Sequence, residues 1–384
     1  MKKRLFLFVT VLAMVCPAAV YACTSVIISG KASPDGRPIM WKHRDTGFLD
    51  NRLEYVKGEK YNFIGLVNST ESTSVSEVWI GSNEAGFSIM NTASYCLNYD
   101  DVPSSQMDRE GVVMRRALEI CETLADFEHF LDTLSRPMGV ESNFGCIDAH
   151  GGAAYYETSN HGYVKRDVCE MEEGYSVMTN FSFSGKKEDW KGVERYRTAS
   201  GIFRRMEKEE GRFRDMGPSV IMDSLSRSYE HQGDSLYIPR YITSSSVVIK
   251  GVRPGESPFN TVIWAALGYP ATSVMIPVPV CGEDHIPAAM KRSAGNHKSE
   301  LCEMSLELKK SVFPYGKNKP EDMVRAREYM TVFSKIEKCI SNDFNIIHDK
   351  YVKRRIKVRK YLKRYDKMMN NYVETIRLES EKLF

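Results

Sequence analysis

The first 23 residues constrain this chain most strongly, because they combine an export leader with a cysteine at its end. Lys2-Lys3-Arg4 form a cationic start, residues 5–16 are apolar, and Val20-Tyr21-Ala22 has residues that signal peptidase accepts before its cut. Cleavage after Ala22 would make Cys23 the first residue of the mature chain. We therefore expect residues 1–22 to be a signal peptide and the mature protein to be exported, either to the periplasm or to the extracellular space.

An N-terminal cysteine places a nucleophile and a base on one residue. The thiol can attack a carbonyl carbon, and the free α-amine, with a reference pKa of roughly 7.7–8.0, can take the thiol proton. The alternative is a membrane-anchored lipoprotein, in which Cys23 is acylated and serves only as an anchor. Tyr21 fits a lipoprotein processing site poorly, so the sequence favours an unmodified Cys23.

The charge balance argues against nucleic acid as a partner. The 384 residues include 53 Lys and Arg and 50 Asp and Glu, and the net charge of +3 disappears when Lys2, Lys3 and Arg4 leave with the signal peptide. Proteins that bind nucleic acid through its phosphates need an excess of cations. The apolar run of residues 5–16 is too short to span a bilayer comfortably, so we expect a soluble mature protein, with membrane contact only if Cys23 is lipidated.

The spacing of the cysteines does not indicate a metal site. The chain has nine cysteines, of which Cys16 lies in the signal peptide. No two of them form a C-x-x-C pair, so a zinc site is not expected and no cofactor is implied. One or two disulfides are compatible with an oxidising compartment, but the sequence favours no particular pairing.

The residues after the leader have the pattern of a β-hairpin. Residues 23–29 are β-branched and apolar, Ser33-Pro34-Asp35-Gly36 is a strong turn signal, and residues 39–44 are typical of a return strand. More strands and three helical segments are expected further along, the first helical segment with a break near Thr123. The strands are expected at 61–67, 75–80, 87–91, 144–148, 153–158, 175–180, 245–250 and 260–267, and the helices at 110–134, 190–209 and 218–229.

The segment 320–384 differs in pattern from the rest of the chain. It is mostly helix-forming, it is rich in Lys and Arg between residues 350 and 367, and its apolar residues recur mostly at three- or four-residue steps. We expect a C-terminal helical extension that packs on a main domain of residues 23–319 and exposes a basic face. The alternative is a docking surface for a membrane or a partner.

Five segments in order carry a resemblance to a known family. They are the opening Cys-Thr-Ser-Val-Ile-Ile-Ser-Gly-Lys-Ala-Ser-Pro-Asp-Gly at 23–36, Asp45 at the end of the second strand, Gly81-Ser82-Asn83-Glu84-Ala85-Gly86 followed by Asn91, Met178-Thr179-Asn180, and Glu194-Arg195-Tyr196. The set resembles the N-terminal-nucleophile hydrolases of the choloylglycine hydrolase and penicillin acyltransferase type, and the opening also resembles N-terminal-cysteine dipeptidases. The resemblance covers about residues 23–197, more weakly to 279, and implies an α+β fold with four layers, an αββα sandwich.

The resemblance also implies a role for each matched residue. Cys23 is the nucleophile, and the side-chain amide of Asn180 and the backbone N–H of Asn91 stabilise the oxyanion. Asp45 holds the α-amine and sets its protonation, and Arg195 orients Asp45 and the carbonyls of the site. His43 should point away from its neighbours in an extended strand, so we expect it to be structural.

This sequence departs from the family pattern at one basic position. The family has an arginine three residues before Asp45, whereas this chain has Lys42 there and an arginine at Arg44. Lys42 and Arg44 would share one face of a strand, so both are candidate substrate-binding residues. A lysine gives a point charge and an arginine a planar fork, and the sequence leaves open which of the two replaces the family arginine.

The resemblance implies hydrolysis of a linear amide through an acyl-thioester on Cys23, with no metal or cofactor. The expected substrate is a small N-acylated amine or amino acid. Acyl transfer of the penicillin acyltransferase type, a dipeptidase, and a lipid-anchored binding protein remain alternatives. The sequence does not exclude a homo-oligomer.

Overall fold

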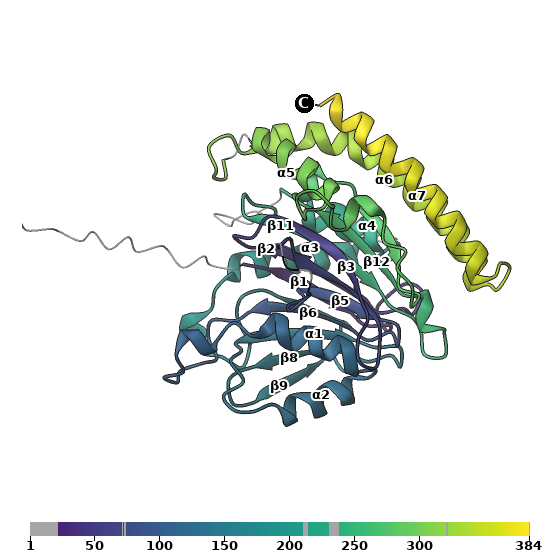
Figure 1. Ribbon diagram of the computed structural model, residues 1–384. Coiled ribbons are helices and arrows are strands. Elements are labelled where there is room, and N and C mark those ends of the chain that lie inside the picture. The colour runs from purple at the N-terminus through teal and green to yellow at the C-terminus, as the bar shows by residue number, and fades with distance from the viewer. Residues whose placement is uncertain are drawn as a thin grey trace, which may run out of the picture.

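The computed structural model describes residues 22–70, 72, 74–209, 214–229, 238–319 and 322–383. The predicted signal peptide therefore lies outside the described residues, except for Ala22. Two antiparallel sheets form the centre of the molecule, with helices on both outer sides (Figure 1).

The first sheet, sheet A, contains the strand that follows Cys23. Its six strands lie in the order β10-β1-β2-β11-β12-β13. They are β1 (Thr24–Ile28), β2 (Ile39–Asp45), β10 (Tyr175–Met178), β11 (Thr243–Lys250), β12 (Val262–Leu267) and β13 (Ile276–Pro279). The strand after Cys23 thus lies inside the sheet, between β10 and β2, where its backbone groups pair on both sides.

The second sheet, sheet B, is a meander in which each strand pairs with the next one along the chain. Its seven strands are β3 (Asn51–Val56), β4 (Phe63–Asn68), β5 (Ile80–Asn83), β6 (Ser88–Ala93), β7 (Ser142–Ile147), β8 (Ala153–Thr158) and β9 (Tyr163–Asp167). The two sheets are in contact where Ser25 Oγ of β1 lies 2.9 Å from Tyr155 Oη of β8.

The predicted hairpin after Cys23 is confirmed. Strands β1 and β2 pair in register, with Val26 opposite Trp41, and Gly36 has the left-handed φ of 73° that suits glycine in a turn. All five residues of β1 and all seven of β2 are buried, because sheets or helices cover both of their faces.

Helices α1 (Glu110–Ile120) and α2 (Leu124–Thr133) cover the outer face of sheet B. Their apolar side chains form a separate core with that sheet, including Phe127 and Phe144. The predicted break near Thr123 is confirmed, because the Thr123 hydroxyl accepts from Asp126 N and the two residues form a capping box at the start of α2.

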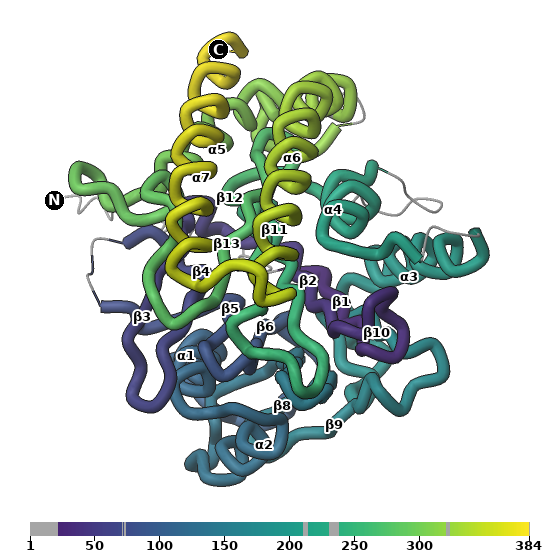
Figure 2. Tube along the Cα trace, turned by 90° about the vertical axis from the view of Figure 1, so that its right-hand side faces the viewer, coloured from purple at the N-terminus to yellow at the C-terminus, as the bar shows by residue number. Residues whose placement is uncertain are grey.

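The remaining helices cover the outer face of sheet A (Figures 1 and 2). They are α3 (Val193–Lys208), α4 (Pro218–Ile221) continued by a π-helical turn (Met222–Ser226), α5 (Glu300–Val312), α6 (Asp322–Val352) and α7 (Val358–Glu381). The molecule is therefore an α+β, four-layer αββα sandwich with C-terminal helices, as predicted.

Helices α6 and α7 run side by side (Figure 2). The apolar stripe of α7, including Tyr361, Tyr365 and Met369, is buried in the same core as sheet A. The basic residues around the turn between them, such as Arg355 and Lys360, are exposed. A domain boundary at residue 320 stays a prediction. No described helix is long and apolar enough to cross a membrane.

The structure differs from the predicted elements in several places. The strand predicted at 75–80 begins only at Ile80, because Val78 N donates to Gly111 O at the start of α1 instead of pairing in the sheet. Strands β3, β9 and β13 were not predicted, and β13 carries Pro277 and Pro279, which an edge strand tolerates. All eight cysteines from Cys23 onward are free thiols.

Candidate active site around Cys23

Cys23 lies one residue before β1, between the ends of two other strands. Ser25 pairs with Met178 on one side, and Thr24 pairs with His43 on the other. Continuing the first register by two residues and the second by one places Cys23 between Asn180 and Arg44. Opposite residues of an antiparallel pair point to the same face of the sheet. Cys23 itself is only 6% exposed.

Asn180 and Arg195 are joined by a hydrogen bond beside Cys23. Arg195, on α3, donates from Nη2 to Asn180 Oδ1 at 2.6 Å, and its Nη1 donates to Cys23 O and to Thr24 Oγ1. Asn180 Nδ2 donates to Ala93 O at 2.8 Å. An amide nitrogen carries two hydrogens, so its second hydrogen is available for an oxygen near Cys23.

Asp45, at the end of β2, is a buried carboxylate held by its neighbours. Thr243 Oγ1 donates to Oδ1 at 2.7 Å, Arg240 Nε donates to Oδ2 at 3.1 Å, and His43 Nε2 lies 3.5 Å from Oδ1. Burial opposes ionisation, but Arg240, His43 and Arg195 outweigh it and lower the pKa of Asp45. A β-bulge between Thr243 and Ser245 directly follows this contact in β11.

Arg240 also reaches the chain just upstream of Cys23. Its Nη2 donates to Ala22 O at 2.9 Å, and Ala22 N donates to Asp45 O at 3.3 Å. The predicted contact between Arg195 and Asp45 is therefore made by Arg240 instead, and Arg195 acts on Asp45 through its charge. Burial lowers the pKa of Arg195 to about 10.

Lys42 and Arg44 lie on the face of sheet A that meets sheet B. Lys42 Nζ donates to Asn91 Oδ1 at 2.6 Å and to Trp79 O at 2.7 Å, and the Arg44 guanidinium lies 4.7 Å from the centre of the Trp79 ring. Burial lowers the pKa of Lys42 to about 7, while the nearby Cys23 thiol favours its charged form. Lys42 can thus change its charge near neutral pH.

Asn91 and His43 complete the set of residues considered in the sequence. Asn91, on β6, lies opposite Phe144 of β7, and its side chain is held by Lys42 and by Ser142 Oγ at 3.2 Å. Donation by its backbone N–H to an oxyanion stays a prediction. Burial lowers the pKa of His43 to about 4, so this side chain is a neutral partner of Asp45.

The structure thus places the other six predicted site residues around Cys23, and it adds Arg240, Thr243 and Trp79, which sequence reasoning missed. None of these three lies in a motif, and no spacing in the sequence links them to Cys23. Among the described residues, no group of three or more His, Cys, Asp or Glu side chains could hold a metal ion.

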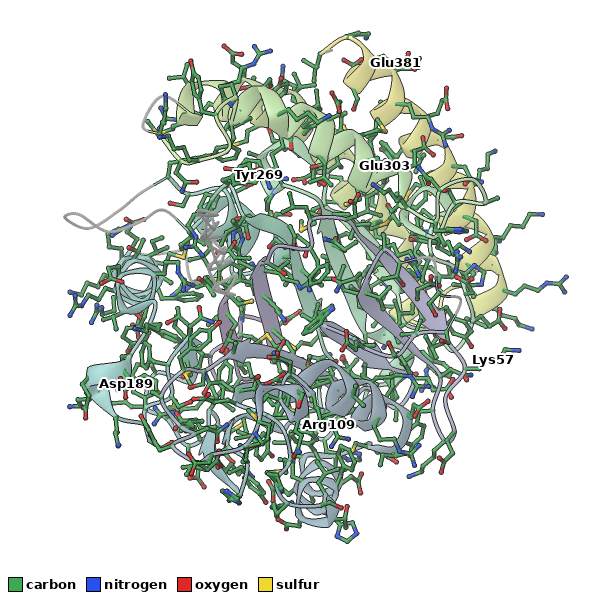
Figure 3. The ribbon with its side chains drawn as sticks, turned by 60° about the vertical axis from the view of Figure 1, so that its left-hand side comes forward. Lys57, Arg109, Asp189, Tyr269, Glu303 and Glu381 are labelled. Carbon is green, nitrogen blue, oxygen red and sulfur yellow. The ribbon has the colours of Figure 1, made fainter. Side chains whose placement is uncertain are left out.

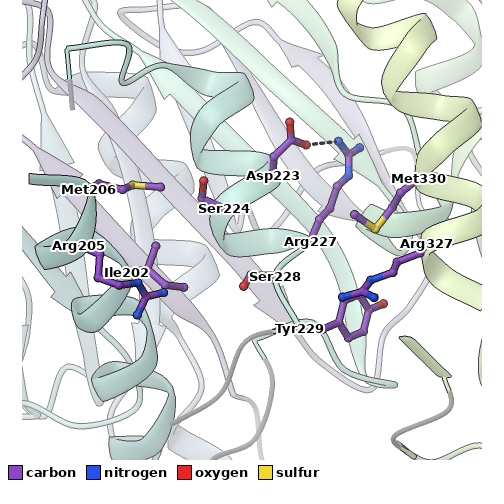
Figure 4. A pocket seen from close by; sticks show the side chains of 10 residues that line it. All are labelled: Ile202, Arg205, Met206, Asp223, Ser224, Arg227, Ser228, Tyr229, Arg327 and Met330. Carbon is purple, nitrogen blue, oxygen red and sulfur yellow. Dashed lines mark hydrogen bonds and ion pairs between the residues drawn. The ribbon is translucent and has the colours of Figure 1, made fainter. Parts of the chain in front are cut away.

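A separate cavity of about 330 Å³ lies between α3, the π-helical turn and α6 (Figure 4). Its lining includes Asp223 and Arg227, joined by an ion pair of 3.0 Å. None of the predicted site residues lines this cavity.

Comparison with known proteins found similar structures only. No family model matches the chain, and no curated protein matches it in sequence. The N-acylethanolamine-hydrolyzing acid amidase ortholog of Caenorhabditis elegans is 17% identical, with a TM-score of 0.43 over 59% of this chain and 92% of its own. A variant of conjugated bile acid hydrolase from Clostridium perfringens is 9% identical, with a TM-score of 0.44 over 68% of this chain and 94% of its own.

Penicillin V acylase from Agrobacterium tumefaciens is 13% identical, with a TM-score of 0.39 over 67% of this chain and 86% of its own. The similarity of the chain to these three structures is at low sequence identity.

Proposed function

We propose that this protein is an exported N-terminal-cysteine amidase of the periplasm or extracellular space. It hydrolyses linear C–N amide bonds of small N-acylated amines or amino acids. The observation that carries the proposal is the convergence on Cys23 of Asn180 and Arg195 from one side and of Asp45 and Arg240 from the other. Amide hydrolysis is also the reaction of the hydrolases that the motifs resemble.

The first half of the reaction acylates the enzyme. Removal of residues 1–22 frees the α-amine of Cys23, which takes the thiol proton while Sγ attacks the amide carbonyl carbon. A C–S bond forms and the carbonyl electrons move onto oxygen, where Asn180 Nδ2 and the Asn91 backbone N–H donate to the oxyanion. When the tetrahedral intermediate collapses, the C–N bond breaks and the α-ammonium gives its proton to the leaving amine.

The second half regenerates the thiol. Water attacks the acyl-thioester with the α-amine as base, the C–S bond breaks, and the proton passes to sulfur as the carboxylic acid leaves. Asp45 stabilises the α-ammonium in each half, because its own pKa is lowered and it stays ionised. Lys42 and Arg44, on the face that meets sheet B, contact the substrate.

The alternatives differ in what accepts the acyl group or in what Cys23 does. An amine in place of water would give acyl transfer, and a free α-amino group on the acyl part would make the enzyme a dipeptidase. A lipoprotein anchor at Cys23 fits less well, because a lipid on its sulfur would have to extend into solvent from a residue that is only 6% exposed.

The test measures hydrolysis by the processed protein, with its N-terminus checked by intact-mass analysis. We expect a start at Cys23 with an unmodified amine, and release of free amine from at least one member of a panel of N-acyl amino acids, N-acyl amines and dipeptides. Cys23→Ala should abolish this activity, and Cys339→Ala, which changes an exposed cysteine on α6, should leave it intact.

Two results would overturn the proposal. A diacylglyceryl group on Cys23 would make it an anchor, and undiminished hydrolysis by Cys23→Ala would place the nucleophile elsewhere. Faster product formation in the presence of an added amine, with the acyl group recovered on that amine, would favour acyl transfer over hydrolysis.

A further inference from the structure

The carbonyl oxygen of residue 22 lies in a polar site formed by Arg240 and Asp45. Arg240 Nη2 donates to Ala22 O at 2.9 Å, and Arg240 Nε binds the Asp45 carboxylate at 3.1 Å. The Arg240 side chain is 12% exposed and that of Asp45 is fully buried, so both are held in place. An oxygen acceptor just upstream of Cys23 N is therefore recognised by a guanidinium that is already positioned.

Processing after Ala22 would empty this position. The carbonyl carbon of residue 22 is bonded directly to Cys23 N, so its loss leaves the guanidinium of Arg240 beside the new α-amine without that acceptor. In the proposed reaction the leaving amine takes its proton from the same α-amine. The substituent of the leaving amine must then lie on the side of Cys23 N that residue 22 occupies in this structure.

An anionic substituent would suit this position. Two guanidinium groups, those of Arg240 and Arg195, act on the single carboxylate of Asp45 beside this position, and burial lowers the pKa of His43 to about 4, so His43 adds no charge at neutral pH. The planar fork of an arginine matches a carboxylate, which it binds with two parallel hydrogen bonds.

Lys42 and Arg44 are less suited to this role. The Lys42 amine is bonded to Asn91 Oδ1 and Trp79 O, and the Arg44 guanidinium lies over the Trp79 ring. Both therefore lie between the sheets, on the side of the Cys23 thiol, where the acyl group of a substrate would be expected. Of these three basic side chains, Arg240 is the one that contacts the residue 22 carbonyl.

We propose that, in the processed enzyme, Arg240 binds the carboxylate of a leaving α-amino acid and so makes N-acyl amino acids the preferred substrates over N-acyl amides of neutral amines. This inference rests on the proposed amidase function and names its substrate class. Arg240 is then a specificity-determining residue, and its bond to Asp45 holds it at the correct place beside Cys23 N.

The test compares two substrates that differ only in the leaving group. N-octanoylglycine and N-octanoylethanolamine carry the same acyl chain, and the first ends in a carboxylate where the second has a hydroxymethyl group. For the unmodified enzyme we expect a higher kcat/KM for the glycine conjugate. If the panel identifies another acyl group as the better one, the same pair is made with that group.

Arg240→Gln should lower kcat/KM for the glycine conjugate roughly 10- to 100-fold more than for the ethanolamine conjugate, the size expected for a lost charged hydrogen bond. Any disturbance of Asp45 should change kcat/KM for both substrates by the same factor. It therefore cancels in the ratio of the two kcat/KM values. Arg240→Lys keeps the charge and loses the planar guanidinium. Its ratio of the two kcat/KM values should therefore lie between those of the unmodified enzyme and of Arg240→Gln. Arg44→Gln removes a cation from the side where the acyl group is expected, so it should change kcat/KM for both substrates by the same factor and leave their ratio unchanged.

Each outcome decides the inference. Preference of the unmodified enzyme for the ethanolamine conjugate overturns it without any variant, so a variant that fails to fold or to be processed does not prevent a decision. An unchanged ratio in Arg240→Gln, or a ratio that falls in Arg44→Gln instead, also overturns it while leaving the amidase function standing. Failure of the unmodified enzyme to cleave any amide would refute the proposed function itself.

Discussion

At the scale of single residues, Asn180 is held at both ends before any substrate arrives. Its Oδ1 accepts from Arg195 at 2.6 Å and its Nδ2 donates to Ala93 O at 2.8 Å. These two bonds fix the plane of the amide and therefore the direction of its remaining N–H. A donor that is already aimed needs no reorientation when negative charge develops on the substrate.

Asn180→Ala should therefore lower kcat roughly 100- to 1,000-fold and change KM little, because the lost hydrogen bond forms fully only in the transition state. Steady-state kinetics on the best substrate of the panel would measure both constants. A raised KM with an unchanged kcat would make Asn180 a substrate-binding residue and would require another oxyanion donor.

The sequence predicted Cys23, Asp45, Asn180 and Arg195 because each lies in a short motif. It could not predict Arg240. This residue lies in a segment without a motif, and it meets Asp45 only because β11 pairs with β2 so that Thr243 lies opposite Asp45. Contacts that depend on the register of strands about 200 residues apart leave no local pattern in the chain.

At the scale of elements, all three strands that sequence reasoning missed, β3, β9 and β13, lie at the edges of the sheets. Strand β1 is buried throughout, whereas β9 has two exposed and three half-buried residues at the edge of sheet B. An edge strand of this kind has no clear alternation, so local reasoning cannot separate it from a loop. The contact of Gly145 with sheet A was also unpredictable, because it joins segments that are distant in the chain.

Gly145, on β7, lies where the two sheets are in contact. A Cβ atom at this position would lie 2.9 Å from Met90 Cε, 2.9 Å from Tyr155 Cε1 and 3.1 Å from Ile27 Cδ1 of β1. Gly145→Val should therefore force the sheets apart and lower the free energy of unfolding by about 1–3 kcal/mol, as overpacking of a core commonly does.

Urea denaturation of Gly145→Val beside Gly162→Ala would test this prediction. A Cβ at Gly162 would have no heavy atom within 4 Å, so this control should stay within about 0.5 kcal/mol of the unmodified protein. Equal stability of all three proteins would mean that the sheets separate without cost and that the glycine is not needed for their packing.

At the scale of the whole molecule, the C-terminal helices and sheet A form one core. Side chains fill the space between them (Figure 3), and Phe344 of α6 packs edge-on against Trp264 of β12 with ring centres 5.3 Å apart. The periodicity of residues 320–384 predicted these helices, but it did not predict that they pack against sheet A. Their packing also buries a polar contact, the ion pair of Arg227 and Glu337.

Arg227, which directly follows the π-helical turn, donates from Nη1 and Nη2 to the carboxylate of Glu337 on α6, both at 2.6 Å. Their side chains are 1% and 9% exposed. Glu337 also accepts from Met275 N, so one carboxylate joins α6 to two other segments of the body. Removing the Glu337 carboxylate would leave Arg227 charged and buried, with the exposed Asp223 as its remaining ion-pair partner.

Glu337→Ala should therefore lower the free energy of unfolding by about 3–5 kcal/mol, the usual cost of breaking a buried ion pair from one side. Glu300→Ala is the matched control, because it breaks the partly exposed pair between α5 and Arg377 of α7, and it should cost less than about 1 kcal/mol. Chemical denaturation followed by circular dichroism would give both values. If both variants lowered the free energy of unfolding by the same small amount, the C-terminal helices would be held by their apolar contacts alone. Arg227 would then have another partner when Glu337 is removed.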